Sequence, residues 1–290
     1  MVDEAEVDSS VAHRPPLKWA GGKRWLVPYL GGLWNKLRNS PESVSGGEHH
    51  DRRLVEPFCG GLAITLGLRP DRALLNDINP HAINFYHCLK RGFTVEREIE
   101  FGNESKLYYR NRARFNGLIA DGESSTAEAA ALFYYLNRTG YNGLCRFNNK
   151  GLFNVPFGKY RRINYSRDFT AYRRAFANWS FTSGDFEDVP IGDRDFIYAD
   201  PPYDVEFTQY SQGGFGWDDQ VRLAQWLAEK DCPAVLSNQA TARIVRLYQS
   251  LGFTLEFMPA PRMINRTGDR TPAREVIATR GFMSDRRRRY

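Results

Sequence analysis

Short apolar segments that end in polar turns alternate with segments of helical spacing, and this alternation constrains the fold more than any other feature. The first apolar segment is Arg53-Leu54-Val55-Glu56-Pro57, and the second is Ala73-Leu74-Leu75-Asn76-Asp77. Stretches with helical spacing follow them, over 62–68 and 79–90. Strands and helices in alternation are typical of a parallel sheet covered by helices. The early chain therefore predicts an α/β fold.

The same alternation returns in the second half of the chain. Four further strands are predicted there, at 195–199, 234–237, 253–257 and 275–279. Helices are predicted over 217–230 and 241–250, with Asp218 and Thr241 as their N-caps.

The middle of the chain interrupts the pattern. Residues from about 100 to 160 hold two or three predicted helices, followed by a Gly- and Asn-rich stretch. Tyr141-Asn142-Gly143 and Asn148-Asn149-Lys150-Gly151 are turn sequences, and the apolar residues between them favour a β-hairpin. We interpret this block as an inserted subdomain. The expected organisation is an arm over 1–14, a main domain over 15–79 and 167–283, an insertion over 80–166 and a basic tail over 284–290.

Composition narrows the class of protein. No run of about 18 apolar residues occurs, so no membrane-spanning helix is expected. The polar segment from Met1 to Arg14 does not resemble a secretory signal, and we expect a disordered arm. The net charge of +6 suits a polyanionic partner. The Arg-rich tail is interpreted as a solvated end, with a phosphate contact as the alternative.

The chain has four cysteines, and none of them forms a C-x-x-C pair: Cys59, Cys88, Cys145 and Cys232. This spacing argues against a disulfide framework and against a zinc site. We expect reduced thiols, no metal, and a cytoplasmic protein.

The sharpest motif is Asp200-Pro201-Pro202-Tyr203, directly after a predicted strand. Two prolines make a rigid turn that projects a carboxylate and an aromatic ring at the carboxyl edge of the sheet. Methylation of an adenine amine needs acceptors for both N–H groups, and Asp200 and the Pro201 carbonyl can supply them. Tyr203 can stack on a base that has left the helix. The alternative is a strand-to-loop turn without chemistry.

Two further segments suggest a nucleoside site. In Glu56-Pro57-Phe58-Cys59-Gly60-Gly61 the glycines allow a ligand to approach the backbone closely. Asp77 closes the next strand, where a carboxylate can bind ribose hydroxyls, although it can equally cap the helix over 79–90.

Lys18-Trp19-Ala20-Gly21-Gly22-Lys23 lacks the spacing of an ATP-binding phosphate loop. Its alternative use is a glycine turn that brings Trp19 and Lys23 over a cofactor. The rings of Trp19, Phe58 and Tyr203 would then surround a sulfonium, with a cation–π contribution of about 0.5–2 kcal/mol.

These motifs, in this order, resemble the Dam-type DNA adenine methyltransferases of the alpha class. The resemblance runs from about Pro16 to Phe282. It includes the segment from Tyr135 to Asn148, together with Phe153-Asn154-Val155-Pro156-Phe157-Gly158, which is similar to the family's recognition hairpin. It implies a Rossmann-like S-adenosylmethionine-dependent fold with an inserted helical and β-hairpin subdomain that recognises DNA.

The resemblance also implies roles for individual residues. The Asp200-Pro201-Pro202-Tyr203 motif would be catalytic. The cofactor would be bound by Trp19, Lys23, Phe58, Cys59, Gly60, Asp77 and Asp200. Double-stranded DNA would be contacted by Lys18, Tyr141, Asn142, Leu144, Arg146 and Pro156. Arg262 and Arg270 would contact phosphate. The expected substrate site is GATC, and the enzyme is expected to act as a monomer in a bacterium, archaeon or phage-infected cell.

The chemistry of the insertion agrees with these roles. An arginine can bind guanine bidentately, and Leu or Pro can contact a thymine methyl. Tyr141 and Asn142 lie where a side chain would fill the gap left by a flipped base. Three alternatives remain: Arg146 contacts only phosphate, the enzyme modifies RNA adenine or protein glutamine, or the protein binds DNA without catalysis.

Overall fold

The structure is a computed structural model that describes residues 14–39, 52–95, 98–204, 214–260 and 273–282. The predicted tail, most of the predicted N-terminal arm, Arg262 and Arg270 lie outside these residues. No helix in the described ranges is long and apolar enough to cross a membrane.

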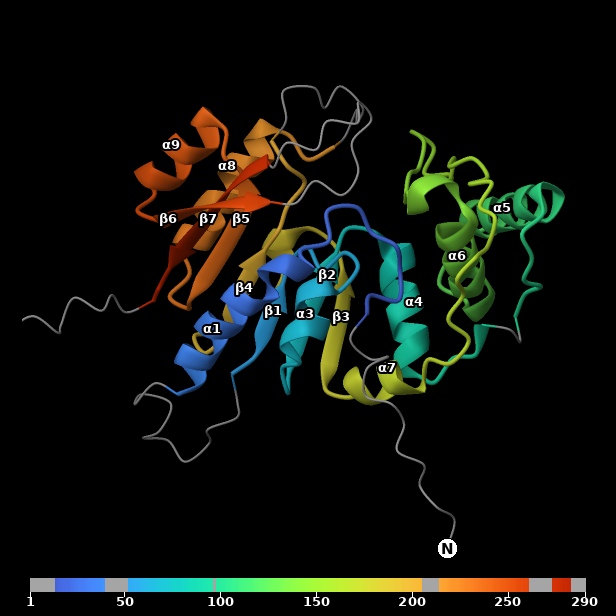
Figure 1. The fold of residues 1–290 in the computed structure, drawn as a ribbon, viewed down its shortest axis with the longest axis horizontal. Coiled ribbons are helices and arrows are strands. Elements are labelled where there is room, and N and C mark those ends of the chain that lie inside the picture. Colours follow the sequence, from blue (N-terminus) through green and yellow to red (C-terminus); the bar gives the residue numbers. More distant parts are fainter. Residues whose placement is uncertain (1–13, 40–51, 96–97, 205–213, 261–272, 283–290) are drawn as a thin grey trace, which may run out of the picture. The chain divides into compact units, whose positions relative to one another are not determined.

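Seven strands of the described residues form one sheet, and the α/β prediction is confirmed (Figure 1). The strands are β1 (Leu54–Glu56), β2 (Ala73–Asp77), β3 (Trp179–Ser183), β4 (Phe196–Ala199), β5 (Ala234–Gln239), β6 (Thr254–Ala260) and β7 (Ala273–Arg280). Their order is β3-β2-β1-β4-β5-β7-β6. The β2–β3, β1–β4 and β4–β5 pairs are parallel, and β7 is antiparallel to both β5 and β6. Six strands agree with the sequence prediction, and β3 was not predicted.

Contacts within the chain divide it into two compact units. The first unit consists of residues 1–50 and 59–184, and the second of residues 51–58 and 185–290. The domain boundaries expected from the sequence remain a prediction.

The first unit is mostly helical. Its helices are α1 (Val27–Arg38), which follows the 3-10 turn η2 (Arg24–Leu26), α3 (Ala63–Leu68), α4 (Pro80–Lys90), α5 (Ser105–Ala120), α6 (Ala127–Thr139) and α7 (Thr170–Ala175). Helix α6 packs against α4 and α5 (Figure 1). Its Ala-, Leu- and Tyr-rich sequence is buried almost throughout, and the ring of Tyr134 stacks on Phe85 at 5.3 Å between centroids.

The segment over residues 140–158 follows α6, and we call it the recognition segment after its predicted role. It begins with the 3-10 turn η4 (Tyr141–Gly143) and contains two antiparallel bridges, Gly140–Phe157 and Phe147–Phe153. The expected hairpin is thus present as bridges rather than as a continuous ladder. Helix α5 explains why, because Asn116 pairs with both the amide and the carbonyl of Phe153, while Tyr108 and Arg112 donate to the Val155 carbonyl.

The second unit carries α8 (Trp217–Ala228) and α9 (Ala242–Ser250), which pack together, and the 3-10 turn η5 (Phe186–Asp188). Thr241 caps α9 as predicted, since its side chain accepts the Ile244 amide. Helix α8 is present as predicted, but Asp218 was wrong as its N-cap. Its N-cap is Gly216, and the Asp219 carboxylate, one turn into the helix, accepts the Gly216 amide at 2.9 Å.

Candidate active site

Two of the sequence motifs leave neighbouring parallel strands of the second unit. Pro57 and Phe58 follow β1, and Asp200 follows β4. Val55 pairs with Ile197, so both chains leave the sheet at the same edge. Because β1 and β4 are adjacent but not consecutive, this is a point where the strand order reverses, and ligands of open α/β sheets bind at such points.

The Asp200 carboxylate is oriented by the next strand. Ser237 of β5 is fully buried, and its hydroxyl donates to Asp200 Oδ1 at 2.8 Å. The Tyr198 hydroxyl lies 3.0 Å from the same Ser237 Oγ. A hydrogen bond to one carboxylate oxygen fixes the direction of the other, so Asp200 is held in one orientation at the end of β4.

Tyr203 is half-buried beside acidic groups. Burial raises the pKa of its phenol strongly, and the negative charges of Asp200 and Glu275 raise it further. The phenol therefore stays protonated at physiological pH. Glu275, a buried carboxylate on β7, was predicted as part of a strand but not as a site residue, because no motif surrounds it in the sequence.

Phe58 belongs to an aromatic group of the second unit. Its ring centroid lies 5.4 Å from Phe215 in an edge-on arrangement and 5.7 Å from Phe186. The Arg222 guanidinium lies 4.5 Å above the Phe186 ring and is paired with Asp185 at 2.8 Å. The turn after β1 is therefore anchored by aromatic packing of the Phe58 side chain.

In the first unit, the side chain of Trp19 packs on the glycine loop at Gly60 and Gly61. A Cβ atom added to Gly60 would lie 2.6 Å from the indole Nε1, and one added to Gly61 would lie 2.8 Å from the Trp19 Cβ. Gly60 also has a φ of +44°, which favours glycine. Both glycines are therefore required for the close approach of Trp19.

Asp77 organises the same loop. Its Oδ2 accepts the Gly60 amide and its Oδ1 accepts the Asn79 amide, each at 2.9 Å. Burial raises the pKa of this carboxyl, and the two amide hydrogen bonds partly offset that effect. The cap of α4 is Asn79, whose side chain accepts the amides of His81 and Ala82, so the alternative role of Asp77 as helix cap was wrong.

Two further residues that the sequence assigned to the cofactor are buried in the same unit. Cys59 is buried, and its amide donates to the Asn76 carbonyl at 2.8 Å. Lys23 is buried, with its ammonium 3.1 Å from the Gly21 carbonyl. Ile78, directly after Asp77, is 72% exposed and was overlooked in the sequence. An apolar residue directly after a carboxylate at a strand end is the signal in the sequence that could have identified it.

This arrangement fits a nucleoside cofactor. A carboxylate for hydroxyl groups, an exposed aliphatic side chain for a base and a half-buried indole on a glycine loop lie within one unit. In the described part of the chain, no cluster of three or more His, Cys, Asp or Glu side chains is arranged to bind a metal ion.

Lys18 makes contacts within the protein. Its ammonium donates to the Arg138 carbonyl at 3.1 Å and lies 4.1 Å from the centre of the Tyr160 ring. Burial lowers the pKa of this ammonium, and the Arg138 charge lowers it further. Asn137 holds the Lys18 backbone through both its N–H and its carbonyl, each at 2.8 Å. Lys18 therefore ties the N-terminal motif to the recognition segment.

The other predicted DNA residues lie on the recognition segment. Tyr141 is 51% exposed, and its amide donates to the Pro156 carbonyl. Asn142 is exposed at a φ of +53°, and Leu144 is half-buried. The exposed Arg146 is held by Asn154, whose Oδ1 accepts from Nε at 2.7 Å and whose carbonyl accepts from an Nη at 3.4 Å.

Comparison with known proteins decides the family. Residues 19–259 match the D12 class N6 adenine-specific DNA methyltransferase family. The chain belongs to this family. The methyltransferase is 36% identical over 283 residues to a DNA adenine methylase of Vibrio cholerae serotype O1, covering 90% of this chain and 94% of that one.

Two further relatives show the range of names. The methyltransferase is 32% identical to the Retron Ec67 DNA adenine methylase of Escherichia coli, covering 91% of this chain and 90% of that one. It is 33% identical to the Type II methyltransferase M1.LlaDCHI of Lactococcus lactis subsp. cremoris, covering 92% and 95%. The chain is thus an adenine-specific DNA methyltransferase, and its cofactor is S-adenosylmethionine.

Proposed function

We propose that this methyltransferase modifies the N6 amine of an adenine flipped out of double-stranded DNA, at GATC. The single observation that carries the catalytic assignment is the Asp200 carboxylate, fixed by Ser237 at the end of β4 with Tyr203 in the same turn. S-adenosylmethionine supplies an activated methyl group when bound. Every other requirement falls on side chains and backbone groups of the protein.

The adenine amine is a weak nucleophile because its lone pair is delocalised into the ring. Asp200 accepts one N–H of the amine, and the Pro201 carbonyl accepts the other. Two acceptors favour a localised lone pair that points away from both of them. The fixed turn of Pro201-Pro202 contributes by presenting these acceptors without reorganisation.

Tyr203 grips the flipped base. Its raised pKa keeps the phenol neutral, so the ring faces adenine without introducing a charge. A neutral ring stacks on the base, and its hydroxyl remains a hydrogen-bond donor. This role requires the ring more than the hydroxyl.

The cofactor is held by the residues that the sequence assigned to it, together with Ile78, which only the structure revealed. Asp77 binds the ribose hydroxyls, and Ile78 packs against the adenine ring of the cofactor. Lys23 pairs with the cofactor carboxylate, while Trp19 and Phe58 surround the sulfonium. Cys59 and Gly60 supply the close backbone approach.

Recognition of GATC is assigned to the recognition segment by its similarity to that of Dam-type enzymes. Arg146 binds guanine, Leu144 and Pro156 contact thymine methyl groups, and Lys18 contributes a charged contact at the edge of the site. Tyr141 and Asn142 occupy the gap in the helix left by the flipped adenine.

Asp200→Ala tests the catalytic assignment. Loss of the acceptor is expected to lower the single-turnover rate of methylation below detection, while salt-dependent affinity for DNA remains unchanged. The matched control is Asp218→Ala, which removes the same charge from an exposed position in the same unit and is expected to be fully active. Methylation at an undiminished rate by a folded Asp200→Ala protein would show that Asp200 is not the acceptor.

A further inference from the structure

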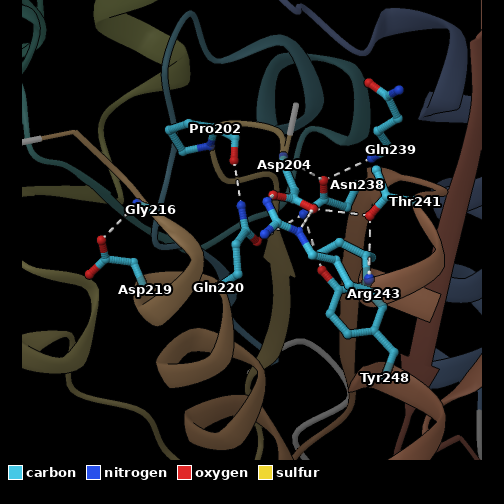
Figure 2. Close-up of polar contacts among 11 residues, drawn as sticks. Pro202, Asp204, Gly216, Asp219, Gln220, Asn238, Gln239, Thr241, Arg243 and Tyr248 are labelled. Carbon is cyan, nitrogen blue, oxygen red and sulfur yellow. Dashed lines mark hydrogen bonds and ion pairs between the residues drawn. The ribbon is translucent and has the colours of Figure 1, made fainter. Parts of the chain in front are cut away.

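Two buried amide side chains, Gln220 and Asn238, form hydrogen bonds with the backbone of the segment from Pro202 to Asp204 (Figure 2). Gln220 of α8 donates its Nε2 to the Pro202 carbonyl at 2.7 Å, and its Oε1 accepts from Asn238 Nδ2 at 2.9 Å. Gln220 is 2% exposed and Asn238 is fully buried. Burying amide groups has a free-energy cost that only well-formed hydrogen bonds offset, so this pair is a specific arrangement.

Asn238 also binds the backbone on the C-terminal side of Tyr203. Its Oδ1 accepts the Asp204 amide at 3.3 Å and the Gln239 amide at 2.8 Å (Figure 2). Its Nδ2 also lies 3.2 Å from the hydroxyl of Tyr248, a buried residue of α9. The amide pair thus binds the backbone at residues 202 and 204, on both sides of the aromatic ring.

The Asp204 side chain anchors the end of the turn. Its Oδ2 accepts from Thr241 Oγ1 at 3.0 Å and from Arg243 Nε at 2.6 Å, and its Oδ1 accepts from Arg243 Nη2. Thr241 caps α9, and the Arg243 guanidinium lies 4.6 Å above the Trp217 ring. The turn is therefore tied to the starts of two helices.

The arrangement distinguishes the two proline carbonyls. Gln220 donates to the Pro202 carbonyl, and this hydrogen bond fixes the plane of the peptide between Pro202 and Tyr203. Among the described residues, no hydrogen bond to the Pro201 carbonyl is observed. The Pro201 carbonyl therefore keeps both of its lone pairs for an incoming N–H group.

We propose that Gln220 and Asn238 are positioning residues for methyl transfer: they hold the Pro202 carbonyl and the Asp204 amide so that the Pro201 carbonyl and the Tyr203 ring face the adenine. The inference rests on the proposed role of the Asp200 turn. Neither side chain touches the substrate. Changes to these side chains are therefore expected to alter the rate of the chemical step and not the affinity for cofactor or DNA.

Gln220→Glu tests this proposal by changing one group at constant size. A carboxylate cannot donate to the Pro202 carbonyl and repels it, so the single-turnover rate at about pH 8 is expected to fall by about 100-fold, the size of effect that a small misplacement produces. Cofactor and DNA affinities are expected to stay unchanged. A protonated carboxyl can donate again, and burial raises the pKa of such a group. The rate relative to the unsubstituted enzyme is therefore expected to rise as the pH falls from about 8 to about 6.

Two variants serve as controls. Gln225→Glu places the same charge on an exposed position of α8 and is expected to keep the full rate at every pH. Gln220→Leu removes the donor without adding a charge, and it is expected to lose rate without recovery at low pH. It also keeps the test decisive if the buried carboxylate prevents folding.

The outcomes separate this inference from the proposed function. A full single-turnover rate in folded Gln220→Leu overturns the positioning role, and so does a Gln220→Glu defect that is the same at every pH. If Asp200→Ala remains active, the proposed function of the turn is wrong and the inference falls with it. If Asp200→Ala is inactive while both Gln220 variants are fully active, only the inference is wrong.

Discussion

Arg146 is oriented before any DNA is present, because Asn154 accepts from its Nε and from one of its Nη groups. A guanidinium fixed at Nε presents its Nη edge in a defined direction, as bidentate recognition of guanine requires. The adjacent Phe147 and Phe153 rings, 5.5 Å apart, keep the segment that carries Arg146 against the rest of its unit.

Arg146→Ala is expected to reduce discrimination between GATC and sites that differ at the guanine by about 1–3 kcal/mol. Asn154→Ala keeps Arg146 but removes the side-chain oxygen that orients its guanidinium. A smaller loss of discrimination at the same base pair is therefore expected. Competition binding with duplexes that carry single base-pair changes measures both effects. An equal loss of affinity for every duplex would show that Arg146 contacts phosphate only.

His81 makes the same region sensitive to acid. Its ring stacks on Phe147 at 4.9 Å and meets Phe115 edge-on at 5.0 Å, and burial lowers its pKa to about 4. A histidine whose pKa is lower in the folded protein stabilises the fold above its unfolded pKa of about 6.5 and loses this contribution as the pH falls towards 4.

We therefore expect the free energy of unfolding to fall by about 2 kcal/mol more between pH 7 and pH 5 in the natural protein than in His81→Phe. Denaturant unfolding at the two pH values measures the difference. Phenylalanine retains the aromatic packing but has no proton to bind. Identical pH dependence in the two proteins would mean that folding does not lower the pKa of His81.

At the scale of elements, the glycine loop after β1 depends on its contact with Trp19. Gly61→Ala would place a methyl group 2.8 Å from the Trp19 Cβ and displace the indole. Overpacking of this kind costs about 1–3 kcal/mol. Binding of S-adenosylmethionine is therefore expected to weaken by about tenfold or more, as measured by calorimetry.

Gly117→Ala is the matched control, because a Cβ there meets nothing within 4 Å and the residue lies inside α5. It is expected to stabilise the protein by about 0.5–1 kcal/mol and to leave cofactor affinity unchanged. If Gly61→Ala also leaves the cofactor affinity unchanged, Trp19 does not contribute to cofactor binding.

The elements that periodicity predicted are those with strong patterns. Strands β1, β2 and β4 are buried throughout and appear as continuous apolar runs. Strand β3 was missed because it lies at the end of the strand order and alternates buried Trp179 and Phe181 with exposed Ser180. Helix α1 was missed because Gly31 and Gly32 weaken its pattern, although Leu30 and Trp34 are buried.

At the scale of the whole molecule, sequence motifs identified the chemistry but not its support. The Asp200 turn, the glycine loop and the recognition segment carry distinctive residues in a fixed order. Ser237, Gln220 and Asn238 carry no motif, and their importance arises only when β5 and α8 are placed beside the turn. Spatial neighbours that are far apart in the chain cannot be paired from one sequence.

The proposed reaction is tested most directly by incubating unmethylated plasmid with the purified protein and labelled S-adenosylmethionine, and then mapping N6-methyladenine. We expect methyladenine at GATC with the natural protein and none with Asp200→Ala. Methylation at another sequence would retain the reaction and contradict the assigned specificity. Absence of label from DNA, with the cofactor still bound, would show that the protein does not methylate DNA adenine.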